Sequence, residues 1–337
     1  MKSSIFFDDI IFDLQQFGGI SEYWRQLSNS PVLSAQFNIQ NFGRLGSSKR
    51  TKFGKLSAKF SRCSTVAHGK AVFHSSYYRL PNNQMPMVVT VHDFIYEKRV
   101  SGLASFVNAY QIRKAIKTAD SIICISNATR NDLLCLMPEI DERRIEVVYH
   151  GVDHATFNNK VVIGDTNAQF SDCVMFVGKR AGYKNFALAV SVLAELNDLR
   201  LLVIGEQLTK DEQEYLTKYL GSRWVSMDGI NNRDLANLYR YCFCLIYPSD
   251  YEGFGMPVLE AMACGCPVIT SSAEALVEIG GSASLKADNR HIDSYVDKVA
   301  AILQNRDMIV AIGFEHVKSF SWDLTAQKMS KIYRLYS

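Results

Sequence analysis

The stretch Pro248–Thr270, PSDYEGFGMPVLEAMACGCPVIT, decides the fold of this chain. The apolar run CFCLIYP leads into it and predicts a buried strand that ends at the first proline. A short loop with Glu252, Gly253 and Gly255 follows, and a proline in the next turn predicts a helix over Pro257–Cys264. A strand, a loop and a helix in this order form the βα unit of a parallel sheet, and such sheets bind ligands beyond the carboxyl ends of their strands. The loop is therefore the first place to look for a binding site.

The loop and the start of the helix carry groups that suit a phosphate. Glycines let the backbone come close to a ligand, and the N–H groups of Met256 to Leu259 lie at the positive end of the helix dipole. Seven residues separate Glu252 from Glu260, so one carboxylate lies in the loop and the other lies a turn into the helix. The plain alternative is an ordinary βα turn with two surface glutamates.

Strand-length apolar runs alternate with helix-period segments through nearly the whole chain, as expected of an α/β protein with parallel sheets. The predicted strands are 5–7, 37–42, 71–74, 87–91, 121–126 and 145–149 in the first half, and 173–178, 199–205, 242–248 and 266–270 in the second.

A polar stretch at 154–171 interrupts this alternation and is interpreted as a linker. We therefore expect an N-terminal Rossmann-like domain over 1–153 and a C-terminal one over 172–319, both doubly wound. The segment 320–337 has apolar positions at helical spacing, which predicts an amphipathic helix that packs back on the N-terminal domain.

The composition is that of a folded globular chain. Of its 337 residues, 47% are hydrophobic and 21% are charged, which excludes disordered and fibrous classes. No apolar run reaches the roughly 18 residues that a membrane-spanning helix needs, and two aspartates near the N-terminus interrupt any signal-peptide core. A cytoplasmic location is therefore expected.

The formal net charge of +3 hides a strong asymmetry along the chain. Residues 1–150 carry 19 basic and 12 acidic side chains, a balance of +7, whereas the remaining residues carry 18 and 22, a balance of −4. The stretch 44–70 holds eight cations interleaved with phenylalanine and leucine at helical spacing, which favours an anionic membrane surface as a partner. A solvated basic loop is the alternative. No nucleic-acid-binding motif accompanies these cations, so no nucleic acid partner is expected.

A second motif, FVGKRAGYKNF at 176–186, follows another predicted strand. It places Arg180 and Lys184 four residues apart at the start of a helix, where their charges can neutralise a diphosphate. Two such cations taken alone are more often solvated surface side chains.

The two motifs together resemble the signature of glycosyltransferase family 4, whose members are retaining enzymes of the GT-B fold. The resemblance rests on Glu252 and Glu260 with GFGMP between them and EAMACGCPVI after them, and on FVGKRAGYKNF. It extends to QFGGISEYW, VVTVHDFIYE, CISNATRNDL and VVYHGVD in the first half of the chain. It implies two Rossmann-like domains that face each other across a cleft, with the reaction between them.

The resemblance also implies roles for individual residues. Glu252 hydrogen-bonds hydroxyl groups of the donor sugar, and Glu260 holds the ribose. Arg180 and Lys184 bind the donor diphosphate and stabilise it as the leaving group, while His92 contacts the transferring sugar. The expected catalytic residues are His92, Arg180, Lys184 and Glu252, and Asp93 beside the histidine is assigned to the acceptor. The expected donor-binding residues are Gly18, Gly19, Gly178, Arg180, Lys184, Gly253, Phe254, Gly255, Met256, Pro257, Val258 and Glu260.

The implied reaction moves a hexose from a nucleotide diphosphate sugar to a glycan hydroxyl in cell-surface polysaccharide assembly, with retention of configuration. The sequence VGKRAGYKN is similar to the form in bacterial O-antigen and capsule mannosyltransferases, which favours GDP-mannose as the donor. A UDP-sugar is the alternative donor, and a GT-B sugar-nucleotide epimerase or a non-catalytic nucleotide-sugar-binding module are alternative functions.

Two further expectations concern metals and the acceptor. No Asp-x-Asp pair occurs in the chain, so no metal is expected. Neither a G-x-G-x-x-G motif nor a Walker A motif occurs, so no cofactor is expected. The basic stretch favours a lipid-linked glycan acceptor and a peripheral location on the inner face of the cytoplasmic membrane.

Overall fold

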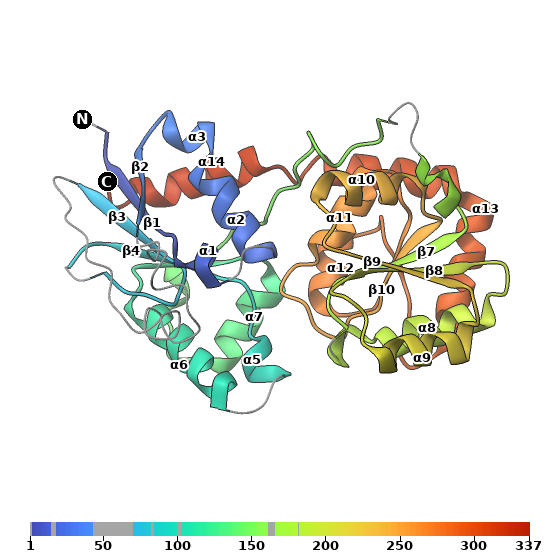
Figure 1. Ribbon diagram of the computed structural model, residues 1–337. Helices are drawn as coiled ribbons and strands as arrows, with labels where there is room; N and C mark the ends of the chain where they lie inside the picture. The colour runs from blue at the N-terminus through green and yellow to red at the C-terminus, as the bar shows by residue number, and fades with distance from the viewer. Residues whose placement is uncertain are drawn as a thin grey trace. The chain divides into compact units, whose positions relative to one another are not determined.

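The computed structural model describes residues 2–14, 18–42, 70–81, 84–99, 103–160, 166–180 and 182–337. The chain forms two compact units, and the described residues of each include a six-stranded parallel sheet (Figure 1). The N-terminal unit consists of Met1–Gly151 and Trp322–Ser337, and the C-terminal unit consists of Val152–Ser321. Parallel sheets covered by helices confirm the predicted α/β class.

The sheet of the N-terminal unit has the order β2-β1-β3-β4-β5-β6, and every neighbouring pair is parallel. Its strands are β1 (Ser4–Asp8), β2 (Asn38–Phe42), β3 (Ala71–Ser75), β4 (Met87–Val91), β5 (Ser121–Cys124) and β6 (Ile145–Val147). Each of them overlaps a run that the sequence predicts as a strand. Strands β3, β4 and β5 are buried along their whole length, which explains why the sequence shows them as continuous apolar runs.

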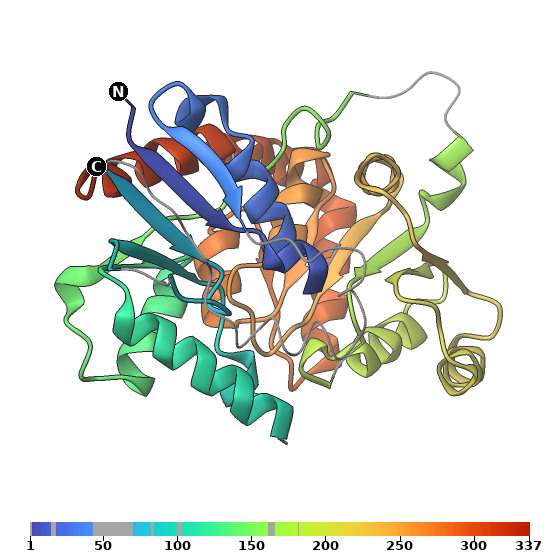
Figure 2. The ribbon, with the colours of Figure 1, turned by 60° about the vertical axis from the view of Figure 1, so that its left-hand side comes forward.

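Helices cover both faces of this sheet, because alternate side chains of a strand point to opposite faces. Ile5 and Phe7 of β1 belong to one hydrophobic cluster, and Phe6 belongs to another. The covering helices are α2 (Gly19–Ser28), α3 (Pro31–Ser34) and α14 (Trp322–Arg334) on one face, and α6 (Leu103–Thr118) and α7 (Asn127–Leu136) on the other. Shorter helices are α1 (Ile10–Leu14), α5 (Ile95–Lys98) and the 3-10 turn η2 (Glu142–Arg144). Helix α14 contacts α2 and α3 (Figures 1 and 2), which confirms that the C-terminal segment packs on this unit.

The sheet of the C-terminal unit has the order β12-β11-β10-β7-β8-β9 and is also parallel throughout. Its strands are β7 (Cys173–Val177), β8 (Arg200–Gly205), β9 (Trp224–Asp228), β10 (Cys244–Tyr247), β11 (Val268–Thr270) and β12 (Leu285–Lys286). Its helices are η3 (Thr166–Phe170), η4 (Gly182–Lys184), α8 (Phe186–Glu195), α9 (Lys210–Leu220), α10 (Asn232–Tyr241), α11 (Met256–Ala263), α12 (Glu274–Gly280) and α13 (Ile292–Val317). The sequence did not predict β9 and β12, because both are edge strands without a fully buried apolar run.

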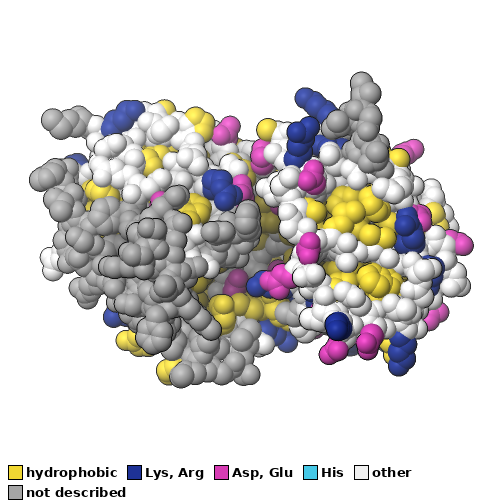
Figure 3. Space-filling view, in the orientation of Figure 1, with side chains coloured by type: hydrophobic (Ala, Val, Ile, Leu, Met, Phe, Trp, Pro, Cys, Tyr) yellow, Lys and Arg dark blue, Asp and Glu magenta, His cyan; other side chains and the backbone are white. Residues whose placement is uncertain are grey.

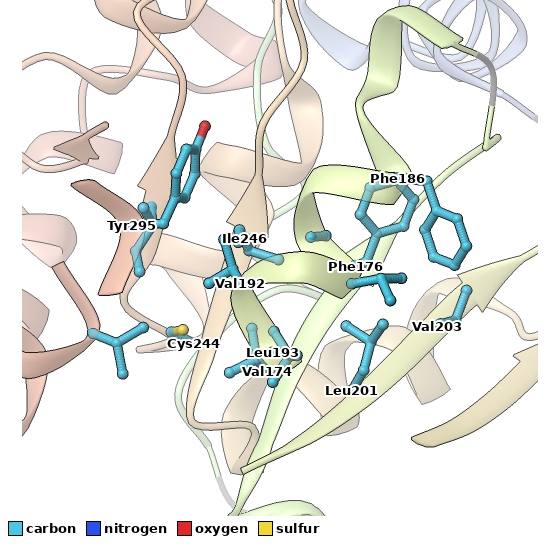
Figure 4. Packing of buried hydrophobic residues seen from close by; sticks show 14 of the residues in the cluster. Val174, Phe176, Phe186, Val192, Leu193, Leu201, Val203, Cys244, Ile246 and Tyr295 are labelled. Carbon is cyan, nitrogen blue, oxygen red and sulfur yellow. The ribbon is translucent and has the colours of Figure 1, made fainter. Parts of the chain in front are cut away.

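The core of the C-terminal unit packs helix α8 against the sheet (Figure 4). Phe176 of β7 meets Phe186, the first residue of α8, with ring centroids 5.1 Å apart and planes at 65°. Leu193 of α8 and Leu201 of β8 are buried in the same cluster. This packing fixes both ends of the loop between β7 and α8, which carries Arg180 and Lys184 in its sequence.

Both sheets have a topological switch point, where the strand order turns back beside the first strand. In the C-terminal unit β7 lies between β8 and β10, and in the N-terminal unit β1 lies between β2 and β3. The loops after β7 and β10 therefore leave the same edge of their sheet side by side. Open parallel sheets bind ligands at such a point.

The described part of the predicted linker 154–171 belongs to the C-terminal unit. The Arg240 guanidinium donates hydrogen bonds to the backbone carbonyl oxygens of Thr156 and Asn158 at 3.2 and 2.6 Å, and Phe157 is buried. The turn η3 packs against α10. Backbone carbonyl oxygens of this stretch therefore accept hydrogen bonds from a neighbouring helix, which distinguishes the stretch from a free connector.

Three features of the structure concern the expected membrane contact. Of the basic stretch 44–70, all residues except Lys70 lie outside the described part of the chain. Within the described part, no helix is both long and apolar enough to cross a membrane. On the face of the C-terminal unit that Figure 3 shows, basic and acidic side chains are interspersed among hydrophobic patches.

Candidate active site

Hydrogen bonds join the loops that follow β7 and β10. The N–H of Asp250 donates to the carbonyl oxygen of Tyr183 at 2.8 Å, and the side-chain amide of Asn185 donates to the carbonyl oxygen of Pro248 at 2.9 Å. Asn185 has a left-handed φ of 53°, which asparagine tolerates better than most residues. These hydrogen bonds hold the two loops together, so the side chains of both loops have fixed positions relative to one another.

An ion pair between Lys184 and Glu252 also links the two loops. Lys184 Nζ donates hydrogen bonds to the carboxylate of Glu252 and, at 2.9 Å, to the phenol oxygen of Tyr247. The Lys184 and Glu252 side chains are 12% and 13% exposed, and Tyr247 is buried. Burial and then the nearby Glu252 carboxylate raise the pKa of Tyr247 well above its usual value, so the phenol stays neutral. The structure thus brings two of the predicted site residues into direct contact.

Arg180 has different partners from Lys184. Its guanidinium donates from Nε and Nη2 to the two carboxylate oxygens of Glu212 at 2.6 and 3.1 Å. It also donates to the carbonyl oxygens of Glu206 and Gln207 at 2.9 and 3.0 Å. These bonds use four of the five guanidinium N–H donors, and the side chain is 7% exposed. Arg180 therefore lies where the loops after β7 and β8 meet, held by acceptors of the chain itself.

Helix α11 begins at Met256, one residue before the predicted start, and Gly255 caps it. The φ of Gly255 is 103°, in a region that glycine adopts without strain. Pro257 has no N–H, and the N–H of Val258 donates to the carbonyl oxygen of Gly255 at 3.0 Å. The prediction that all the N–H groups of this turn face a phosphate is therefore wrong for these two residues. The N–H of Met256 remains a candidate phosphate donor.

The other predicted residues near α11 differ in their exposure. Phe254 and Val258 are buried packing residues, and the Phe254 ring meets that of Phe320 with centroids 6.4 Å apart. Gly253 is also buried, whereas Glu260 is half-buried one turn into the helix. Of these residues, Glu260 is the one whose side chain has both the charge and the exposure to bind a ligand.

A pocket of about 430 Å³ opens at the carboxyl ends of β8 and β9. A Cβ at Gly205 would lie 2.5 Å from the carbonyl oxygen of Gly178, so this close approach of β7 and β8 requires a glycine. Gly178 itself has a φ of 118°. The pocket is lined by Glu206, Gln207, Leu208, Met227, Asp228 and Ile230, among others. Its mixture of carboxylate, amide and apolar side chains suits a planar heterocycle with polar edges.

In the N-terminal unit His92 directly follows β4 and lies in a buried aromatic cluster. It is 5% exposed, and its ring centroid lies 5.1 Å from that of Tyr23 and 5.5 Å from that of His150. Burial lowers the pKa of His92 to about 3, so the imidazole is neutral at ordinary pH. Its Nε2 atom is buried and has no hydrogen-bond partner within the described part of the chain. Because buried polar atoms usually have a partner, Nε2 is a candidate ligand contact.

The predicted neighbours of His92 begin helices. The carboxylate of Asp93 accepts a backbone hydrogen bond at the start of α5. Gly18 and Gly19 are exposed at the start of α2, and the carbonyl oxygen of Gly18 accepts a hydrogen bond of that helix. Since α2 also carries Tyr23, this helix connects the glycine pair to His92. Among the described residues, no group of three or more His, Cys, Asp or Glu side chains could hold a metal ion.

Tyr247 and Glu212 belong to the site, although the sequence does not indicate either of them as a site residue. Tyr247 lies in a predicted strand, where an aromatic residue indicates only core packing. Glu212 carries a local signal, because Thr209 and Glu212 form a capping box at the start of α9. That signal predicts the helix start, but it does not predict the bond to Arg180.

Two family models match the chain. Residues 168–314 match the family of glycosyl transferases group 1, and residues 38–156 match glycosyltransferase family 4. O-antigen chain mannosyltransferase B of Escherichia coli is 24% identical over 283 residues, which are 78% of this chain and 74% of that protein. A 4-alpha-N-acetylgalactosaminyltransferase of Campylobacter jejuni, named for a diphospho-undecaprenol acceptor, is 29% identical over 199 residues, 57% of this chain and 52% of that protein.

Solved structures share the fold along the whole chain. Sucrose-phosphate synthase from Thermosynechococcus elongatus has a TM-score of 0.75 at 19% identity and covers 99% of both chains. Anabaena HepE, solved in complex with UDP-glucose, has a TM-score of 0.70 at 14% identity and covers 98% of both chains. Because the two family models together span the larger part of the chain and the fold is shared with these enzymes, the protein belongs to the glycosyltransferases of the GT-B fold.

Proposed function

We propose that this glycosyltransferase transfers mannose from GDP-mannose to a hydroxyl group of a glycan acceptor, with retention of the anomeric configuration. The observation that carries the proposal is the Lys184–Glu252 ion pair at the joined ends of β7 and β10. A cation suited to a diphosphate and a carboxylate suited to sugar hydroxyls lie together there, at the point where a parallel sheet binds its ligand.

Cleavage of the bond at the anomeric carbon leaves negative charge on the diphosphate. Lys184, Arg180 and the N–H of Met256 bind that charge more tightly in the transition state than in the ground state, which lowers the barrier. When the donor binds, the carboxylate of Glu252 accepts hydrogen bonds from the sugar hydroxyls, and that of Glu260 accepts them from the ribose.

The acceptor attacks the face of the sugar from which the diphosphate departs. The leaving phosphate takes up the proton of the acceptor hydroxyl. Because Arg180, Lys184 and the start of α11 neutralise the diphosphate in this proposal, we expect the reaction to need neither a metal nor a cofactor. His92 offers a neutral imidazole Nε2 to the transferring sugar. The acceptor binds to the N-terminal unit near Gly18, Gly19 and Asp93.

The pocket at the ends of β8 and β9 favours guanine as the base. The Asp228 carboxylate there accepts hydrogen bonds only, and guanine offers it the adjacent N1–H and N2–H donors. Uracil instead flanks its N3–H with carbonyl oxygens, which a carboxylate repels. Similarity to an O-antigen mannosyltransferase supports mannose as the sugar. A UDP-sugar is the second candidate, because the similar HepE structure contains UDP-glucose.

The proposed acceptor is a lipid-linked glycan at the inner face of the cytoplasmic membrane. The Campylobacter relative supports it, since its name describes an acceptor carried on diphospho-undecaprenol. Helix α6 also exposes Phe106 and Tyr110 by 73% and 58%, one turn apart, and Lys114 is exposed a further turn on. Aromatic and basic side chains on one helix face suit the interface of an anionic bilayer.

Isothermal titration calorimetry of the full chain with GDP, UDP and ADP tests the donor. We expect GDP to bind at least about tenfold more tightly than the other two, a difference of about 1.4 kcal/mol. Tighter binding of UDP would overturn GDP-mannose as the donor. Failure of all three to bind would overturn glycosyl transfer from a nucleotide sugar.

Product analysis tests the reaction. With GDP-mannose and a lipid-linked oligosaccharide, mass spectrometry should find the acceptor heavier by one hexose, and the new linkage should have the anomeric configuration of the donor by NMR. Activity should persist in excess EDTA. A modified sugar nucleotide released without any acceptor would instead identify an epimerase.

Vesicle flotation at low salt tests the membrane contact. The wild type should float with vesicles that contain phosphatidylglycerol and not with neutral ones, and Phe106→Ser with Tyr110→Ser should weaken flotation. Leu303→Ser, which removes an exposed hydrophobic side chain from α13, is the matched control and should float as the wild type does. No flotation of the wild type with anionic vesicles would overturn the membrane proposal.

A further inference from the structure

Glu212 connects helix α9 to the loop that follows β7 in the C-terminal unit. Its carboxylate accepts hydrogen bonds from the N–H and the hydroxyl of Thr209, at 2.8 and 3.1 Å, in the capping box of α9. The same carboxylate accepts the Nε and Nη2 bonds of Arg180. The first turn of α9 is thereby tied to the loop that follows β7.

Arg180 extends this connection to the wall of the pocket. Its Nη1 and Nη2 donate to the carbonyl oxygens of Glu206 and Gln207, and both of these residues line the pocket at the ends of β8 and β9. Carbonyl oxygens of a loop have no strand partner, so a fixed donor holds the loop in place. A guanidinium suits this task because its donors form a rigid planar fork.

We infer that Glu212 is a positioning residue, which holds the Arg180 fork against the 206–207 loop and so fixes the pocket wall that contacts the nucleoside part of the donor. The inference rests on the proposed function, because it requires that a nucleotide binds in this pocket. It gives Arg180 a second task beside the binding of the diphosphate.

Because Glu212 is charged, a positioning role can be distinguished from a direct electrostatic effect on the bound nucleotide. Its hydrogen bonds with Arg180 lower the pKa of Glu212, so the carboxylate is ionised at neutral pH. If only its charge mattered, its removal would strengthen the binding of an anionic nucleotide, since a negative charge near Arg180 would be lost. If Glu212 positions the wall, its removal weakens nucleotide binding. The two effects have opposite signs.

The test compares Glu212→Gln with Glu214→Gln, which removes the same charge from an exposed position on the same helix. The probes are GDP, GMP and inorganic pyrophosphate, with UDP and UMP in parallel, in titration calorimetry of the full chain. We expect Glu212→Gln to weaken the binding of both nucleotides of the preferred base by about tenfold, whereas the binding of pyrophosphate, which does not contact the pocket wall, should not weaken. Glu214→Gln should bind all probes as the wild type does.

Kinetics add a readout that a general loss of structure would not give. Glu212→Gln should raise the KM for the donor about tenfold while kcat at saturating donor stays within about twofold of the wild type. Arg180→Lys, which keeps the charge and loses the fork, should reproduce the loss of GMP binding. It serves as the second variant if Glu212→Gln fails to fold.

Several outcomes would overturn the inference. They are unchanged or tighter nucleotide binding in Glu212→Gln, a loss of pyrophosphate binding without a loss of GMP binding, or a loss of equal size in Glu214→Gln. In each of these cases the wild type still binds a nucleotide, so the proposed function stands. If the wild type binds no nucleotide at all, the proposed function fails and the inference fails with it.

Discussion

Lys184 and Glu252 are 68 residues apart in the chain, and their side chains meet in a hydrogen-bonded ion pair between the loops after β7 and β10. Both side chains are largely removed from water, and the Lys184 ammonium donates hydrogen bonds both to the Glu252 carboxylate and to the Tyr247 phenol oxygen. A bound sugar nucleotide would enter this arrangement with a diphosphate for the lysine and hydroxyl groups for the glutamate. The two side chains that we propose to bind the donor are therefore also the two that stabilise each other's charge in this structure.

Lys184→Met should abolish most of the activity. Loss of a preorganised cation at the leaving group should reduce kcat by at least about 100-fold, and the largely buried Glu252 carboxylate left without its lysine should lower the free energy of unfolding by about 3 kcal/mol. The measurements are donor-saturated turnover and urea unfolding.

Lys179→Met is the matched control for that variant, because Lys179 lies in the same loop and its side chain is exposed. It should keep its stability within about 0.5 kcal/mol and its activity near that of the wild type. The double variant Lys184→Met with Glu252→Gln should recover part of the stability but none of the activity. Near wild-type turnover in Lys184→Met would refute the role of the pair.

Gly255→Ala should destabilise the start of α11. A Cβ there would lie 2.7 Å from the Leu276 side chain and would also require a left-handed φ of 103°. We expect the free energy of unfolding to fall by about 1 to 3 kcal/mol, and kcat/KM to fall because the N–H of Met256 moves. Gly182→Ala is the control, since a Cβ at Gly182 meets nothing within 4 Å. Equal thermal stability of the two variants would contradict this explanation.

Asp228→Asn should change the preference for the base. An amide cannot accept both donors of guanine as a carboxylate does, so GDP binding should weaken by about tenfold while UDP binding stays the same or improves. Ser226→Ala, at another residue that lines the pocket, is the control for a general change of the surface and should leave the ratio of the two affinities unaltered. An unchanged ratio in Asp228→Asn would exclude Asp228 as the contact that selects the base.

Stability should depend on pH through three buried histidines of the N-terminal unit. Burial lowers the pKa of His74 and His92 to about 3 and that of His150 well below its usual value, so all three are neutral in the folded protein. In the unfolded chain they take up protons below about pH 6.5, so the unfolded state binds more protons and gains stability as the pH falls. From pH 7.5 to 5.5 the free energy of unfolding should fall by about 4 kcal/mol from these groups together.

His150→Phe provides the control for the pH dependence. It removes one of the three groups, so the loss of stability between pH 7.5 and 5.5 should be smaller by about 1.4 kcal/mol, whatever its effect at neutral pH. Urea unfolding at the two pH values measures both losses. The same loss in the variant and the wild type would show that His150 does not contribute.

The sequence predicted the parts of the fold that local pattern controls. Buried strands such as β4 appear as continuous apolar runs, and the Gly-rich turn before α11 requires a conformation that glycine adopts most easily. The edge strand β9 was missed because its side chains are partly exposed and its pattern is mixed. The polar stretch that the sequence indicates as a linker accepts hydrogen bonds from Arg240, a contact over more than 80 positions that no local pattern reveals.

The candidate site likewise has features that the sequence predicts and features that only the tertiary structure shows. Apolar periodicity and spacing in the sequence placed Arg180, Lys184, Glu252 and Glu260 after predicted strands, and the resemblance to glycosyltransferase family 4 predicted their roles in the chemistry. Only the tertiary structure decided their hydrogen-bond partners. Lys184 binds Glu252, and Arg180 binds Glu212. The N–H of Val258 donates to the carbonyl oxygen of Gly255 at the start of its own helix. The physical reason is that the strand order brings loops from distant parts of the chain to one edge of the sheet, and buried charges and N–H groups there bind whichever acceptors that order provides.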